Sequence, residues 1–179
     1  MRQVTLKDKT FVPYITSDKI SESVKKLALS INAELKDEFP LFLVVLNGSF
    51  MFAADLLKEV DIPCEISFIK LASYHGTSST GNVTELIGLT EEIKGRTVVV
   101  VEDIVDTGVT LEKLVTVLNK KGVKQVKIAS FLLKPEAYKK DIEVNYVGMR
   151  IPNDFVVGYG LDYDGLGRNL KDVFVLKSN

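Results

Sequence analysis

A run of four valines most constrains the fold of this chain. Residues 97–111 read TVVVVEDIVDTGVTL, and four consecutive β-branched residues indicate a buried strand at the centre of a parallel sheet. The apolar run stops at Glu102 and Asp103, where we expect the strand to end. A helical period then follows, formed by Leu111, Leu114, Val115 and Leu118. The stretch therefore predicts a strand, a polar loop and a helix.

The polar loop has the composition of a phosphate site. Backbone amides at a helix N-terminus point at an anion, hydroxyl groups add donors, and a glycine lets the backbone come close. We expect these groups in Thr107, Gly108, Val109 and Thr110. Two neighbouring carboxylates do not favour a phosphate, so Glu102 and Asp103 are assigned to sugar hydroxyl groups or to a hydrated magnesium ion. An ordinary strand-to-helix turn is the alternative, but such a turn needs no acidic pair.

The composition indicates one α/β domain of an intracellular protein. A chain of 179 residues, 46% of them hydrophobic, suits one substantial core better than two. The net charge of -1 attracts neither nucleic acid nor an anionic membrane, and no segment resembles a signal peptide or a transmembrane span. Cys64 is the only cysteine, which favours a reducing cytoplasm, and its strand-like surroundings predict a buried structural thiol. We therefore expect a cytoplasmic protein that binds neither nucleic acid nor membrane.

Strands alternate with helices along the middle of the chain. Residues 17–38 form an amphipathic helix capped by Ser17 or Asp18, and residues 41–46 form a strand that leads through Asn47 and Gly48 into a second helix. Further strands are expected at residues 66–71, 126–133, 144–149, 155–159 and 173–176. This order predicts an α/β fold with a central, mostly parallel twisted sheet flanked by helices, and the short closing strands form a small cap. We expect residues 1–179 to form one domain, with a core of about residues 40–150.

The longest polar stretch, residues 73–83, reads SYHGTSSTGNV and carries no fixed charge. It is either a disordered connection or a lid that closes over a ligand. His75 is the only histidine, and its place in this glycine-containing stretch favours a solvated residue over a general base.

The arrangement around the valines resembles the phosphoribosyl-pyrophosphate signature of type I phosphoribosyltransferases. That signature is an apolar strand, Glu-Asp, two apolar residues, Asp-Thr-Gly, any residue and Thr, and every position is filled here. The resemblance implies that this substrate also meets Asn47, Gly48, Asp106 and the lid, with Ser73 and Tyr74 at its start. The family usually has a basic residue at the position of Asn47, beside a cis peptide bond, so a side-chain ion pair there is not expected.

Residues 132–134 and 154–168 are similar to the phosphoribosyltransferases that act on 6-oxopurines. The segment DFVVGYGLDYDGLGR carries this resemblance. It implies that Lys134 donates to the 6-oxo group, that Phe155 stacks on the purine and that Val156 meets the base edge through its backbone. Asp162 is expected beside the base site as a magnesium ligand with Glu102 and Asp103. Arg168 is expected to bind pyrophosphate.

The implied reaction transfers a phosphoribosyl group to N9 of hypoxanthine or guanine. Positive charge then develops on the sugar and negative charge on pyrophosphate, and Asp106 is the expected base for the N7 proton. The resemblance also implies a Mg²⁺ cofactor, a homodimer or homotetramer, and a cap that includes the N-terminal segment and about residues 151–179. The alternatives are an enzyme for xanthine or another base, or a non-catalytic regulator that binds phosphoribosyl pyrophosphate.

Overall fold

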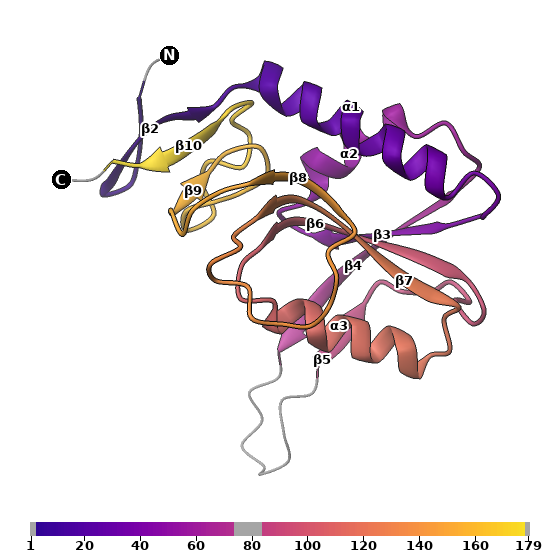
Figure 1. Ribbon diagram of the computed structural model, residues 1–179. Coiled ribbons are helices and arrows are strands. Elements are labelled where there is room, and N and C mark those ends of the chain that lie inside the picture. Colours follow the sequence, from indigo (N-terminus) through magenta and orange to yellow (C-terminus); the bar gives the residue numbers. More distant parts are fainter. Residues whose placement is uncertain (1–2, 74–83, 178–179) are drawn as a thin grey trace, which may run out of the picture.

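A six-stranded sheet forms the centre of the protein (Figure 1), whose computed structural model describes residues 3–73 and 84–177. The strand order is β5 (Thr84–Ile87), β4 (Glu65–Ser73), β3 (Leu41–Leu46), β6 (Thr97–Val105), β7 (Gln125–Leu133) and β8 (Tyr146–Arg150). Five neighbouring strands run parallel, whereas β5 at one edge is antiparallel to β4. The parallel strands are β4, β3, β6, β7 and β8. The expected mostly parallel sheet is confirmed.

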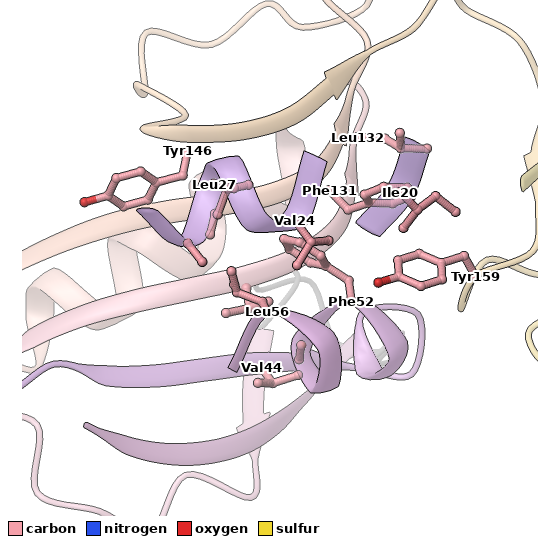
Figure 2. Packing of buried hydrophobic residues seen from close by; sticks show 14 of the residues in the cluster. Ile20, Val24, Leu27, Val44, Phe52, Leu56, Phe131, Leu132, Tyr146 and Tyr159 are labelled. Atoms are coloured by element: carbon pink, nitrogen blue, oxygen red, sulfur yellow. The ribbon is translucent and has the colours of Figure 1, made fainter. Parts of the chain in front are cut away.

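Three helices cover the two faces of this sheet. Helices α1 (Ser17–Glu34) and α2 (Phe50–Glu59) lie on one face, and α3 (Val109–Lys120) lies on the other (Figure 1). Figure 2 shows the first interface, where Val24 and Phe52 from the two helices pack with Phe131 of β7. The second interface is built from Leu111, Leu114 and Leu118 of α3 against the strands. The valines of β6 alternate between these two cores, so the central strand has no solvent-facing side.

The two ends of the chain meet in a second, antiparallel sheet. Its strand order is β1 (Val4–Leu6), β2 (Lys9–Ile15), β10 (Val173–Leu176) and β9 (Val156–Val157). We call this sheet, with the loop of residues 158–172 that joins β9 to β10, the hood. Tyr159 of that loop packs edge-on against Phe131, with ring centroids 4.9 Å apart, so the hood shares a core with α1 and α2. The predicted cap from both chain ends is confirmed.

Several predicted boundaries are wrong for identifiable reasons. The first helix ends at Glu34 rather than near residue 38. Leu35 is buried and therefore fits the apolar period, but it is the C-cap residue and lies outside the helix. Thr16 caps the other end, where its hydroxyl accepts the Lys19 amide hydrogen, so neither Ser17 nor Asp18 is the cap. Strand β6 continues beyond Asp103 to Val105 because its last residues pair with β7.

Two other sequence predictions change in the structure. The strand expected at residues 155–159 is reduced to Val156–Val157, because Gly158, Tyr159 and Gly160 all have positive φ and turn the chain away. Cys64 precedes β4 instead of lying within a strand, and it is only partly buried against the larger core. Burial raises the pKa of its thiol, which agrees with a structural role.

Candidate active site

The predicted site residues gather where the strand order of the sheet reverses. From β3 the chain first adds β4 and β5 on one side of that strand, and then adds β6, β7 and β8 on its other side. Ligands of open α/β sheets bind outside the carboxyl ends of the strands at such a switch point. Here the loop after β3 carries Asn47 and Gly48, and the end of β6 carries Glu102 and Asp103. The topology therefore supports a binding site between β3 and β6.

The loop between β6 and α3, which we call the phosphate loop (residues 106–110), has the predicted strand-loop-helix form. Gly108 is the N-cap residue with a φ of 79°, a left-handed conformation that suits glycine. Its carbonyl accepts the Glu112 amide hydrogen at 2.9 Å, which opens the first turn of α3. The loop and Glu102 enclose a small cavity of about 110 Å³. Free amide groups at this helix start make the cavity suitable for an anion.

Gly108 is supported on its outer side by residues 138–140, a segment distant from it in the sequence. A β-carbon at Gly108 would collide with the Tyr138 ring and would lie 2.9 Å from Cγ of Lys140. The Tyr138 hydroxyl donates to the Ile142 carbonyl at 2.5 Å, and the Lys140 ammonium lies 2.7 Å from the Glu112 carboxylate. The contacts of Tyr138 and Lys140 with Gly108 and Glu112 join residues about thirty positions apart, so no local spacing in the sequence signals them.

The two acids at the end of β6 have different surroundings. Glu102 is buried and lines the cavity of the phosphate loop. Asp103 instead touches the loop after β3, where a β-carbon at Gly48 would collide with its carboxylate. Burial raises the pKa of Glu102 well above its usual value, and the Asp103 charge raises it further. Burial also raises the pKa of Asp103, against the opposing effect of the Ile104 amide hydrogen bond. Both acids therefore favour a partner that carries donors or positive charge.

The hood brings Asp162 and Arg168 to the edge of the sheet where β3 and β6 end. The guanidinium of Arg168 lies 2.7 Å from the Asp162 carboxylate and donates to the Gly160 carbonyl at 2.7 Å. Gly160, with a φ of 98°, contacts the Gly48 carbonyl so closely that no β-carbon would fit. Both residues also act on Asp103 through their charges: the positive charge of Arg168 lowers the pKa of Asp103, and the negative charge of Asp162 raises it. The structure therefore brings these hood residues together with the ends of β3 and β6.

The loop after β3 contains the peptide geometry expected from the resemblance. The bond between Leu46 and Asn47 is cis. Asn47 is exposed, whereas Gly48 is buried against Asp103 and Gly160.

Asp106 and Lys134 form an ion pair at the ends of β6 and β7. Their side chains approach to 2.9 Å between Oδ2 and Nζ. Lys134 is buried, with 9% of its surface exposed, and its amide donates to the Val105 carbonyl at 3.0 Å. The paired ends of the two strands thus hold an acceptor and a cationic donor side by side.

Phe155 and Val156 stand at the hood side of the site with opposite exposure. Phe155 is 44% exposed and therefore has ring surface free for a ligand, whereas Val156 is buried in β9. The Phe155 ring meets Tyr163 edge-on at 5.9 Å between centroids, and Lys9 lies 4.8 Å from the Tyr163 ring centroid. Lys9 could not be predicted beside these rings, because its position depends on the pairing of β2 with β10.

Other predicted features lie partly outside the described residues. Ser73 is the last residue of β4, whereas Tyr74, His75 and the rest of the predicted lid fall outside residues 3–73 and 84–177. Across those described ranges, no three His, Cys, Asp or Glu side chains gather closely enough to hold a metal ion by themselves. Within the same part of the chain, no helix is both long and apolar enough to cross a membrane.

Comparison with known proteins agrees with this geometry. The family model described as phosphoribosyl transferase domain matches residues 16–164. The hypoxanthine-guanine phosphoribosyltransferase of Bacillus subtilis (strain 168) is 40% identical over 164 residues, which are 91% of this chain and 91% of that protein. The corresponding protein of Streptococcus pneumoniae (strain ATCC BAA-255 / R6) is 42% identical over the same shares. A crystal structure of a hypoxanthine phosphoribosyltransferase from Staphylococcus aureus superposes with a TM-score of 0.85 at 36% identity, covering 93% of this chain and 94% of that one.

Fold, site and family model together define a phosphoribosyltransferase. More narrowly, the chain belongs to the hypoxanthine-guanine phosphoribosyltransferase family.

Proposed function

We propose that the protein transfers the 5-phosphoribosyl group of phosphoribosyl pyrophosphate to N9 of hypoxanthine and guanine. The products are IMP or GMP and pyrophosphate, which makes this a reaction of purine salvage. The observation that carries the proposal is the ion pair of Asp106 and Lys134, 2.9 Å apart beside the phosphate loop. Membership of the hypoxanthine-guanine phosphoribosyltransferase family supports the same reaction.

This pair matches one edge of a 6-oxopurine. The 6-oxo group and N7 are neighbours on the purine, one an acceptor and the other a donor when N7 is protonated. An ammonium group offers three donors and no acceptor, and a carboxylate offers acceptors only. Lys134 would donate to the oxo group while Asp106 takes the N7 proton as N9 attacks the sugar. Adenine would instead place amino hydrogens against the donors of Lys134.

We assign to the remaining site residues the stabilisation of the charges that develop during the transfer. Positive charge grows on the ribose ring and negative charge on the departing pyrophosphate, as in glycoside cleavage. We assign the ribose hydroxyl groups to Glu102 and Asp103, and the 5-phosphate to residues 107–110. The pyrophosphate group is assigned to Arg168 and to the amide of Asn47 or Gly48, because the hood packs Gly160 directly against Gly48. In this proposal Phe155 stacks on the base, the backbone of Val156 meets its edge, and Ser73 and Tyr74 contact phosphoribosyl pyrophosphate.

The carboxylates suit a magnesium ion that is bound together with the substrate. Burial is the main reason for the raised pKa of Asp103, and the negative charge of Asp162 raises it further, so a cation between the two carboxylates would relieve both effects. Magnesium is usually held by one or two carboxylates together with substrate phosphates rather than by protein ligands alone. Such a site needs no cluster of three protein ligands, and the described residues contain none. Glu102, Asp103 and Asp162 are the proposed ligands, one or two of which would hold the ion together with substrate phosphates, and the ion would neutralise phosphate charge when bound.

We also propose a homodimer or homotetramer of one-domain chains in the cytoplasm. Ile66 and Phe68 of β4 are 46% and 49% exposed, and alternate residues of a strand face the same side. Two large apolar side chains on one open face are suited to contact with another copy. Sedimentation analysis of the purified protein with the Phe68→Ser variant would test this, because a monomeric wild-type protein would contradict it.

An activity screen tests the reaction itself. The purified protein is supplied with phosphoribosyl pyrophosphate, Mg²⁺ and one base at a time from hypoxanthine, guanine, xanthine, adenine and uracil. We expect nucleotide formation with hypoxanthine and guanine, no detectable product with adenine or uracil, and loss of activity when EDTA removes the metal. Preferential use of xanthine, or no turnover with any base, would contradict the proposal.

A further inference from the structure

The phosphate loop lacks a cation of its own. Its residues between Asp106 and Leu111 are Thr107, Gly108, Val109 and Thr110, none of which is basic. A sugar 5-phosphate carries nearly two negative charges at neutral pH. Amides and hydroxyl groups contribute only partial charges, and the helix terminus adds about half of one positive charge. The loop therefore depends on its surroundings for charge balance.

Glu112 makes that balance worse because it stands in the first turn of α3. Glu112 follows Leu111, the last residue that lines the cavity of the phosphate loop, and its side chain is 48% exposed, so water screens its charge only in part. Two like charges at this range oppose each other. An unpaired Glu112 would consequently weaken phosphate binding.

Lys140 is placed to remove this repulsion. Its ammonium lies 2.7 Å from the Glu112 carboxylate, and its side chain is only 25% exposed. Its stem passes over Gly108, with Cγ 2.9 Å from the position of a β-carbon there. Lys140 is held over the loop because the Tyr138 amide bonds to the Lys134 carbonyl at 3.0 Å, so the segment after β7 folds back on the phosphate loop.

We propose that Lys140 is a positioning residue for the substrate phosphate, because it neutralises Glu112 from the outer side of the phosphate loop. This inference rests on the proposed function, since it concerns the affinity of the same site for phosphoribosyl pyrophosphate. It assigns to the segment after β7 two tasks at once, because Lys134 at its start faces the base and Lys140 at its end serves the phosphate.

The test separates charge from packing. Lys140→Met keeps the stem over Gly108 and removes the ammonium, while Lys140→Arg keeps the charge. Lys139→Met is the matched control, because Lys139 is the exposed neighbour on the same segment. Dissociation constants for phosphoribosyl pyrophosphate with Mg²⁺ and for IMP are measured by titration calorimetry at low salt.

We expect Lys140→Met to weaken both ligands by roughly threefold to tenfold, the range of a partly screened charge pair. Lys140→Arg and Lys139→Met should stay within about twofold of the wild type. Adding Glu112→Gln to Lys140→Met should restore most of the lost affinity, because the uncompensated carboxylate is then gone. Raising the salt concentration should shrink the difference between Lys140→Met and the wild type.

Two results would overturn the inference. One is a Lys140→Met variant that binds both ligands as well as Lys139→Met does. The other is a double variant that binds no better than Lys140→Met alone, which would make the contact one of packing. Wild-type protein that neither binds nor turns over phosphoribosyl pyrophosphate would instead refute the proposed function, so the two failures are distinguishable.

Discussion

The phosphate loop and the hood build the same site by opposite means. The loop extends a buried parallel strand into a helix, and its residues are neighbours in the sequence. The hood instead brings Asp162 and Arg168 to the site through a run of positive-φ residues and through pairing of the two chain ends. A strand end fixes position by the regular ladder of the sheet, whereas the hood fixes it by individual close contacts such as Gly160 on Gly48. We therefore expect substitutions at strand ends to affect chemistry and substitutions in the hood to affect assembly of the site.

The largest effect is expected from Asp106→Asn on the strand side. The amide is nearly isosteric with the carboxylate but cannot take a proton, so the single-turnover rate should fall by about a hundredfold to ten thousandfold. Binding of phosphoribosyl pyrophosphate should change little, since the loop amides remain. Rapid-quench measurement of IMP formation checks the rate, and a loss below about threefold would remove Asp106 from the role of base.

Lys134→Gln should have the next largest effect. A glutamine offers both a donor and an acceptor, so it should lower kcat/KM for hypoxanthine by about a hundredfold and narrow the gap to adenine. Lys139→Gln is the control, because it removes the charge of an exposed lysine nearby. The ratio of kcat/KM for the two bases is the measurement, and an unchanged ratio would assign base choice to the backbone at Val156 instead.

Gly160→Ala tests the junction between the two regions. Its β-carbon would collide with the Gly48 carbonyl at a φ of 98°, so we expect the free energy of unfolding to fall by about 2 to 4 kcal/mol. Gly165→Ala is the matched control, with a φ of 82° but no atom within 4 Å of its β-carbon, and should cost only about 1 kcal/mol. Urea unfolding gives both values, and equal losses would show that the contact with Gly48 is unimportant.

The smallest effect is the pH dependence of stability that the two buried acids create. Their pKa values are raised on folding, above ordinary values of 4.5 for Glu102 and 3.8 for Asp103. Between the ordinary and the raised values the folded protein keeps protons that the unfolded chain releases, so the contribution of these two acids to stability is fully present below the ordinary values and is lost as pH rises through the folded values. The Glu102→Gln, Asp103→Asn variant should lose this dependence.

At neutral pH that variant should be more stable than the wild type by about 1 kcal/mol, or about 2 to 4 °C in Tm. Thermal unfolding from pH 4 to pH 8 measures it. A variant that melts well below the wild type at pH 7 would mean that the acids hold the fold together. The expected increase in stability of the variant would instead show that Glu102 and Asp103 destabilise the fold and serve ligand binding.

Sequence periodicity was sufficient for the regular part of the molecule. β3 and β10 have the predicted boundaries, because an unbroken apolar run of that length suits a buried strand. The order of strands and helices also predicted the parallel sheet. The N-terminal strands β1 and β2 were expected only as part of a cap, since their apolar residues show no clear period and their partner β10 lies at the other end of the chain.

The candidate site divides in the same way. The acids and the phosphate loop could be identified because they interrupt and follow the apolar run of β6, whereas Lys134 was identified from the resemblance to phosphoribosyltransferases that act on 6-oxopurines. The neighbours of Asp103 could not, because its contact with Gly48 joins two strands that are distant in sequence. Tyr138 and Lys140 were missed for the same reason, and so was Lys9 beside Tyr163. The spacing of residues along a chain carries no information on which loops fold back on one another.

The pairing of β2 with β10 has a consequence for synthesis of the protein. A ribosome completes the strands of the central sheet at Arg150, while the hood lacks a central strand until Val173–Leu176 has emerged. Domains that emerge from the ribosome first can begin to fold first. The N-terminal strands must therefore wait through most of translation for their partner, and the hood, including Phe155 beside β9, is the last part of the enzyme to assemble.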